Sequence, residues 1–416
     1  MNILLKDFNT FDKTDINSQI VIFGAGTIGR LTDLALKKIG INTVFFVDSD
    51  PRKHGKKVQN KKIISPDELK KFDTKNTHVF IACNYFSSIV PFLKKNNFLS
   101  FYKVTNILKN VDVYKLYNEI DMNMLFSKLL PLKLERNLTF YNEMCNKEDY
   151  VTSDKLRLKS IDVQITEKCS LKCKDCANLM QYYKKPMDSD YNLLVSSMDK
   201  IMDSVDYIDE LRVLGGDPFM NKELDKIINK LVTYKNLGKI VVYTNARFIP
   251  KNEKLDYLKQ PRVILDITDY GDASAAAEQF VEFAIKEGIS YSINKCTTWQ
   301  DCGRIIPNNN KSEKELIHQF DNCCNSDLIS LLHGKIYRCP FSANGVNLKA
   351  FKSDESDEIN LTNNIGKQDL RNKIMHLAFG KKYLTACRFC NGRDYATANI
   401  PSAIQAKSKL EYEYQN

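Results

Sequence analysis

Glu167-Lys168-Cys169-Ser170-Leu171-Lys172-Cys173-Lys174-Asp175-Cys176 is the stretch that decides the fold and chemistry of most of this chain. It follows residues 160–166, where apolar and polar side chains alternate as in a β-strand with one apolar face. Three thiols within eight residues at a strand end can bind three irons of a cubane cluster, which leaves the fourth iron without a protein ligand. Structural zinc sites and ferredoxin clusters use four protein ligands instead. The spacing therefore indicates a metal centre with an open position, as catalysis requires.

Polar residues also follow the next predicted strands. Residues 211–214 lead into Gly215-Gly216-Asp217-Pro218, and an amphipathic helix is expected next, ending at Gly238. Two more strands, 240–243 and 263–266, are followed by short polar turns. Because active sites of (β/α) barrels form at the carboxyl ends of their strands, these turns predict cofactor or substrate contacts. The residues singled out are Gly215, Gly216, Asp217, Thr244, Asn245 and Asp269.

The spacing of cysteine, three residues, cysteine, two residues, cysteine resembles the signature of the radical S-adenosylmethionine (radical SAM) superfamily. The resemblance implies a partial (β/α)6 barrel in which Cys169, Cys173 and Cys176 bind a [4Fe-4S] cluster and S-adenosylmethionine chelates its open iron. It also implies that the Gly-Gly-Asp-Pro turn, usually Gly-Gly-Glu-Pro in that family, binds the methionine amino group. Asp175 is a departure, because the family usually has an aromatic residue there.

Seven further cysteines lie beyond the triplet, and four positions among them could close a second metal site. From the residues alone either zinc or a closed iron–sulfur cluster fits. The segment resembles the SPASM/Twitch extension of radical SAM enzymes, which implies an auxiliary [4Fe-4S] cluster. Its implied ligands are Cys339, Cys387, Cys390 and either Cys323 or Cys324. Cys296 and Cys302 are interpreted as packed thiols, with a second cluster or a proton-donating thiol as the alternative.

The first hundred residues predict a nucleotide-binding βαβ unit. A strand at 18–23 runs into a glycine turn and a helix, and a second strand at 43–47 ends in Asp48. Gly24, Gly26 and Gly29 would let a pyrophosphate approach the backbone, and Asp48 would accept ribose hydroxyls. The pattern resembles small Rossmann domains attached to sugar-nucleotide acyltransferases and methyltransferases, which implies a nucleotide or nucleotide-sugar ligand. NAD redox chemistry and a ligand-free scaffold are the alternatives.

The 416 residues thus predict an α/β protein with four parts. These are a Rossmann-like domain with a parallel sheet (1–110), a helical linker (111–157), the radical SAM partial barrel (158–300) and a small cysteine-rich α+β auxiliary domain (301–416).

The net charge of +10 is concentrated in the first hundred residues, without the aromatic interleaving of a nucleic-acid groove. Neither a signal peptide nor a membrane span is expected, so twelve cysteines indicate metal ligation in a reducing cytoplasm. The lysine-rich tail after Ser402 is expected to be a solvated helix end.

These features predict an enzyme that cleaves S-adenosylmethionine reductively and abstracts hydrogen from an unactivated carbon. Its expected substrate is a sugar or nucleotide-sugar of cell-surface polysaccharide synthesis, which it would oxidise or epimerise. A flavodoxin or ferredoxin would supply the electron. A maturase of ribosomal peptides using the same chemistry is the alternative, and a non-catalytic zinc-binding nucleotide sensor is the alternative of another class. Trp299 and Asp301 are further candidates for substrate contact.

Overall fold

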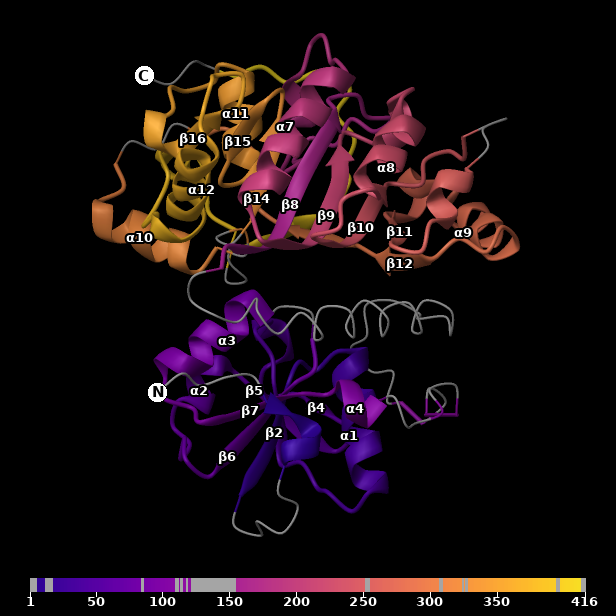
Figure 1. Cartoon of the computed structure of the whole chain (residues 1–416). Helices are drawn as coiled ribbons and strands as arrows, with labels where there is room; N and C mark the ends of the chain where they lie inside the picture. Colours follow the sequence, from indigo (N-terminus) through magenta and orange to yellow (C-terminus); the bar gives the residue numbers. More distant parts are fainter. Residues whose placement is uncertain are drawn as a thin grey trace. The chain divides into compact units, whose positions relative to one another are not determined.

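The computed structural model divides the chain into two compact units, Met1–Lys155 and Leu156–Asn416, shown in Figure 1. Most of the predicted linker at 111–157, and Cys324, lie outside the described residues. The structure describes residues 6–11, 18–83, 86–108, 112, 115–116, 119–120, 155–250, 255–306, 310–323, 325, 328–393 and 397–412. None of the helices in these ranges combines the length and apolar character that crossing a bilayer requires.

The first unit contains a seven-stranded sheet in the order β1-β7-β6-β2-β3-β5-β4. All its neighbours are parallel except β4 and β5. From β5 to β7 the order is third, second, first, fourth and fifth, as in doubly wound nucleotide-binding sheets. The strands are β1 (Lys6–Asp7), β2 (Gln19–Phe23), β3 (Phe45–Val47), β4 (Lys57–Val58), β5 (Lys61–Ile64), β6 (Thr77–Ile81) and β7 (Ser100–Lys103). The helices are α1 (Thr27–Lys38), α2 (Pro66–Leu69), α3 (Phe86–Lys95) and α4 (Thr105–Leu108).

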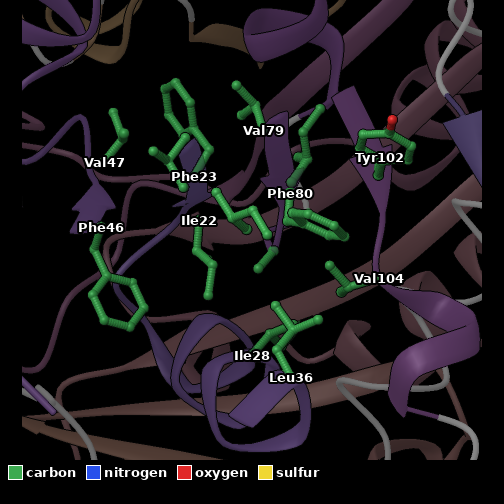
Figure 2. Packing of buried hydrophobic residues seen from close by; sticks show 14 of the residues in the cluster. Ile22, Phe23, Ile28, Leu36, Phe46, Val47, Val79, Phe80, Tyr102 and Val104 are labelled. Atoms are coloured by element: carbon green, nitrogen blue, oxygen red, sulfur yellow. The ribbon is translucent and has the colours of Figure 1, made fainter. Parts of the chain in front are cut away.

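The glycine turn between β2 and α1 has a steric basis. Gly24 has a φ of +115°, and a Cβ on Gly29 would lie 1.8 Å from the Gly24 carbonyl oxygen. Only glycine therefore allows α1 to start this close to the sheet. Figure 2 shows Ile22 and Phe80 from the sheet, and Ile28 from α1, in the core of this unit.

The second unit contains an eight-stranded sheet in the order β12-β11-β10-β9-β8-β14-β15-β16. The six strands from β12 to β14 are parallel, whereas β15 and β16 are antiparallel. The strands are β8 (Arg157–Thr166), β9 (Tyr207–Gly215), β10 (Leu237–Thr244), β11 (Val263–Asp269), β12 (Tyr291–Lys295), β14 (Ile329–Leu332), β15 (Lys335–Tyr337) and β16 (Glu358–Asn360). The helices are α7 (Tyr191–Ser204), α8 (Leu224–Leu231), α9 (Ala277–Lys286), α10 (Glu313–Asp321), α11 (Pro340–Asn347) and α12 (Lys367–Met375).

This arrangement confirms the predicted α/β class with parallel sheets. A separate two-stranded sheet pairs β13 (Thr298–Gln300) with β17 (Asn399–Pro401). The prediction that a helix ends at Gly238 is wrong, because α8 ends at Leu231. Gly238 instead lies within β10, where a Cβ would come 2.3 Å from the Asp209 carbonyl oxygen of the neighbouring strand β9.

Strand β8 is buried on both faces, although its sequence alternates. Ile161, Val163 and Ile165 are fully buried on one face, as predicted. The polar residues between them are buried as well, with Asp162 and Gln164 at 3% and 1% exposure. A central strand of a parallel sheet is covered on both sides, so its polar face lies inside the molecule rather than in solvent. This interior polar face forms part of the site.

Candidate active site

The three cysteines of the loop after β8 line one cavity of about 330 Å³. The carboxyl ends of β9 and β10 contribute four of the predicted residues to the same cavity: Gly215, Gly216, Thr244 and Asn245. Trp299 also lines it and packs edge-on against Tyr270, with ring centroids 5.4 Å apart. Its volume lies in the range of small-molecule sites, about 300 to 1,000 Å³. The tertiary fold thus brings together residues that the sequence spreads over more than a hundred positions.

The turn after β9 is locked against the cysteine loop by backbone hydrogen bonds. Gly216 donates its N–H to the Thr166 carbonyl at 2.8 Å, and Asp217 donates to the Lys168 carbonyl at 2.8 Å. A Cβ on Gly215 would lie 2.0 Å from the oxygen of Thr166, and one on Gly216 would lie 2.0 Å from the oxygen of Lys168. Both glycines are therefore required for this contact, since no side chain fits between the two backbones.

Asp217 is buried behind the cavity wall, and its carboxylate accepts hydrogen bonds on both oxygens. Oδ2 accepts from the Thr244 hydroxyl at 3.0 Å and from the Asn245 N–H at 3.2 Å, whereas Oδ1 accepts from the Phe219 N–H at 3.1 Å. Burial raises the pKa of Asp217 to about 6, against the lowering effect of these hydrogen bonds. Asp217 thus holds the end of β10 in place. Asp269 stabilises the turn after β11, because its Oδ1 accepts the N–H of Gly271 at 2.8 Å.

The environment of the loop thiols suits an iron–sulfur cluster. Burial raises the pKa of Cys169 and Cys176, and burial with the nearby Cys176 raises the pKa of Cys173 to about 12. Such thiols become thiolates when a bound metal supplies the compensating positive charge. Within the described ranges, no three His, Cys, Asp or Glu side chains converge on one point that could hold a single ion. Three separate thiols on one cavity wall fit a cubane, because each thiolate binds a different iron.

Two amide side chains contact the cysteine sulfurs. Asn245 Nδ2 lies 3.5 Å from Cys169 Sγ, and Gln405 Nε2 lies 3.3 Å from Cys173 Sγ. Gln405 belongs to the tail after Ser402, which is not the expected helix end, although Lys407 in this tail is exposed to solvent as expected. The tail is extended there and pairs with the cysteine loop, because Lys174 donates its backbone N–H to the Ile404 carbonyl at 2.9 Å.

Asp175 replaces the aromatic residue expected before the third cysteine. It is buried, and its Oδ1 accepts a hydrogen bond from Arg304 Nε at 2.6 Å. A buried carboxylate paired with a guanidinium is stable where an unpaired one would not be. The substitution therefore ties the loop to the segment after β13.

Asp162, on the interior face of β8, also lines the cavity, together with Arg212 and Arg393. Its Oδ1 is buried without a hydrogen-bond partner. Burial raises the pKa of Asp162 to about 7; Arg212 and Arg393 oppose this increase, and Glu210 adds to it. A buried carboxylate oxygen without a partner is costly unless a ligand donates to it. The sequence did not single out Asp162, because an alternating strand does not show whether its polar face meets solvent or a cavity.

Replacing Asp162 by asparagine is expected to change the pH dependence of stability. The folded protein holds a proton on this carboxyl that the unfolded chain releases above pH 4, so wild-type stability falls as the pH rises from about 4 to about 7. The asparagine amide cannot ionise, so the variant does not lose stability in this way. The difference in unfolding free energy between the variant and the wild type should therefore grow from pH 4 to pH 7, to at most about 4 kcal/mol in favour of the variant. Urea unfolding of both proteins at pH 5 and pH 8 measures this difference in unfolding free energy. Asp321→Asn, which alters an exposed carboxylate, is the control; a gain at Asp162 that is the same at both pH values would contradict the prediction.

A second, smaller cavity of about 40 Å³ is lined by cysteines of the C-terminal segment. These are Cys302, Cys323, Cys339, Cys387 and Cys390. Burial raises the pKa of Cys339 and Cys390, and it raises that of Cys387 to about 12. Cys302, which the sequence left as a packed thiol, lines both cavities. None of the ten cysteines in the described part of the chain forms a disulfide bond.

In the first unit, Asp48 contacts the glycine turn directly. Its Oδ2 accepts the N–H of Ala25 at 2.9 Å and pairs with Lys53 Nζ at 2.9 Å, and its Oδ1 accepts the N–H of Asp50 at 2.9 Å. These bonds use the carboxylate that was expected to bind ribose. Nucleotide binding by Gly24, Gly26, Gly29 and Asp48 therefore stays a prediction.

Comparison with known families gives two matches. Residues 16–97 match the family described as C2185-like, N-terminal, and residues 162–282 match the family described as 4Fe-4S single cluster domain. A GTP 3′,8-cyclase of Campylobacter jejuni is 23% identical over 143 residues, covering 33% of this chain and 44% of the relative. A GTP 3′,8-cyclase of Helicobacter pylori is 26% identical over 153 residues, covering 32% and 45%. The chain thus spans less than half the length of these two relatives.

Among solved structures, BtrN in complex with AdoMet and 2-DOIA is 18% identical to this chain, with a TM-score of 0.35. The similarity covers 57% of this chain and 94% of BtrN. The 4Fe-4S family match begins on β8 and includes the three-cysteine loop and the glycine turn that line the main cavity. Together with the relatives found by sequence, this supports the predicted membership of the chain in the radical SAM superfamily, for which a [4Fe-4S] cluster and S-adenosylmethionine are the expected cofactors.

Proposed function

We propose that Cys169, Cys173 and Cys176 hold the [4Fe-4S] cluster and that the enzyme abstracts a hydrogen atom from an unactivated carbon of a sugar or nucleotide-sugar. The observation that carries this proposal is the position of three thiols, one on a buried and two on half-buried cysteines, on the wall of one cavity that the glycine turn also lines. When bound, the cluster and S-adenosylmethionine supply a 5′-deoxyadenosyl radical, with the electron coming from an external donor such as a flavodoxin or ferredoxin.

The chain's own residues would orient the cofactor. The backbone of Gly215 and Gly216 lies against the cysteine loop, and Asn178 of that loop donates to the Gly215 carbonyl at 3.2 Å. Thr244 and Asn245, held by Asp217, face the same cavity from β10. We assign the binding of S-adenosylmethionine to this end of the cavity, because it combines backbone polar groups with two fixed side chains.

The polar lining supports a hydroxyl-rich substrate. Besides Asp162, Arg212 and Arg393, the cavity is lined by Asn325 and Gln300. A sugar offers both hydrogen-bond donors and acceptors to such groups, whereas an apolar substrate offers neither. The sugar-related resemblance of the N-terminal unit supports the same substrate class.

Net oxidation to a ketone is the outcome that the two cavities favour. Asp162 has a free oxygen and a pKa near neutrality, so it is suited to accept the hydroxyl proton of the substrate. The second cavity shares Ala177, Cys302, Asn325 and Arg393 with the first. We propose that Cys339, Cys387, Cys390 and Cys323 or Cys324 hold an auxiliary [4Fe-4S] cluster there, which would supply an electron acceptor close to the substrate.

Anaerobic purification and reconstitution of the full chain test the proposed function. We expect a brown protein with about eight iron and eight sulfide per chain, corresponding to two cubanes. Incubation with S-adenosylmethionine and dithionite should release 5′-deoxyadenosine. About four iron per chain together with zinc would limit the proposal to one cluster. A colourless zinc protein that does not cleave S-adenosylmethionine would refute it.

A further inference from the structure

The tail segment, residues 397–412, returns to the cysteine loop and pairs with it. Two backbone hydrogen bonds join the loop to the part of the tail that follows β17. Lys174 of the loop donates its N–H to the Ile404 carbonyl at 2.9 Å, and Ala406 of the tail donates its N–H to the Lys172 carbonyl at 2.7 Å. Cys173 and Gln405 form an antiparallel bridge between these two bonds. The loop that carries the three thiols is therefore backed by a strand-like segment more than two hundred residues away in sequence.

Further contacts hold the tail segment in this register. Ala403 is 5% exposed and packs in one apolar cluster with Leu171 and Cys173. Farther along, Lys409 Nζ donates to the Met180 carbonyl at 3.0 Å, and Leu410 donates its N–H to the Gln181 carbonyl at 3.0 Å. The tail thus follows the loop from Leu171 to the residues beyond Cys176.

The orientation of the Gln405 amide is determined by its partners. Its Oε1 accepts the backbone N–H of Lys172 at 2.7 Å, and its Nε2 donates to the Ala403 carbonyl at 2.6 Å. A backbone N–H requires an acceptor and a carbonyl requires a donor, so the amide cannot be flipped. The NH2 group must therefore face Cys173 Sγ, at 3.3 Å.

We propose that Gln405 is a positioning residue of the radical SAM cluster, whose N–H donates to the sulfur of Cys173 and raises the reduction potential of that cluster. The inference rests on the proposed function, because it needs a cluster on Cys169, Cys173 and Cys176. Hydrogen bonds to ligand sulfurs favour the more electron-rich reduced state, and they are one of the protein's means of setting cluster potentials. Asn245 makes the longer contact of 3.5 Å to Cys169, so two of the three sulfurs face an amide donor.

Two substitutions separate this role from simple packing. Gln405→Glu keeps an oxygen that can accept the Lys172 N–H, and it removes the N–H groups donated to the Cys173 sulfur and to the Ala403 carbonyl. Its negative charge also lowers the potential, so the inference requires that a neutral variant lowers it as well. Gln405→Met is that neutral variant; it is similar in length and removes all three contacts. Lys407→Gln is the matched control, because Lys407 is an exposed residue of the same tail segment.

The experiment is a redox titration of the anaerobically reconstituted full chain, followed by electron paramagnetic resonance. The signal assigned to this cluster is the one that changes when S-adenosylmethionine is added. We expect both Gln405 variants to lower its midpoint potential, with a tenfold or larger fall in the reduction equilibrium constant, which is about 59 mV for one electron. Lys407→Gln should match the wild type, and the iron content of Gln405→Glu should be unchanged.

The possible results distinguish the inference from the proposed function. A Gln405→Glu protein with a full cluster and the wild-type potential would overturn the role of Gln405 and leave the proposed function intact. If only Gln405→Met shifts the potential, the contact with the Lys172 N–H is responsible and the N–H to sulfur is not, which also overturns the inference. A wild-type protein without a signal that responds to S-adenosylmethionine would overturn both.

Discussion

Replacing any one of Cys169, Cys173 and Cys176 by alanine is expected to abolish the release of 5′-deoxyadenosine and to remove about four iron atoms per chain. A cubane held by three thiolates has no spare protein ligand, so losing one leaves two irons without a side chain. We expect a fall in rate of at least about a thousandfold, that is, about 4 kcal/mol in activation free energy. Quantification of 5′-deoxyadenosine by chromatography and of iron by a colorimetric assay measures both effects.

The control for these variants is Cys83→Ala in the first unit. Cys83 forms no disulfide bond and does not line either of the two cysteine-lined cavities. Its replacement should leave iron content and cleavage as in the wild type, which would exclude a general effect of removing a thiol. If a variant of the triplet kept both its visible absorption and its cleavage of S-adenosylmethionine, the proposed cluster site would be wrong.

Replacing Gly216 by alanine is expected to have the second-largest effect. The added Cβ would lie 2.0 Å from the Lys168 oxygen, 2.4 Å from its carbonyl carbon and 2.9 Å from the Cys169 nitrogen. All three atoms belong to the backbone, so the clash cannot be relieved by a side-chain rotation and the cysteine loop must move. We expect a loss of at least about 3 kcal/mol in unfolding free energy, since even ordinary overpacking costs about 1 to 3 kcal/mol. We also expect weaker cluster retention.

Urea unfolding of the cluster-free protein and visible absorption after reconstitution measure the two consequences. Gly366→Ala is the matched control, because a Cβ there meets no atom within 4 Å and its φ is −70°. Gly366 is the N-cap of α12, where replacement by alanine should cost about 1 kcal/mol or less. Equal stability losses for the two variants would show that the contact at Gly216 has no special role.

Local features were predicted well from the sequence. Ser65-Pro66-Asp67-Glu68 has the sequence pattern of a capping box with proline at the first helical position, and the structure has this capping box at the start of α2. The strand, glycine turn and helix of the first unit appear as β2 and α1. Each of these signals depends on residues a few positions apart, for which backbone geometry alone determines the preference. The Gly238 prediction failed because a glycine can serve close strand packing as well as a helix end.

The spacing of Cys169, Cys173 and Cys176 was sufficient by itself to predict the superfamily and an open-cornered cluster, because three ligands on one short loop need no distant partner. Only the tertiary structure decided what surrounds them. The Gln405 amide reaches Cys173 across 232 positions, and the return of the tail that brings it there leaves no periodic signal in the sequence. Asp162 likewise became a candidate proton acceptor only when the sheet was seen to be covered on both faces. Alternation along a strand defines two faces, but the packing of distant elements determines which of them borders a cavity.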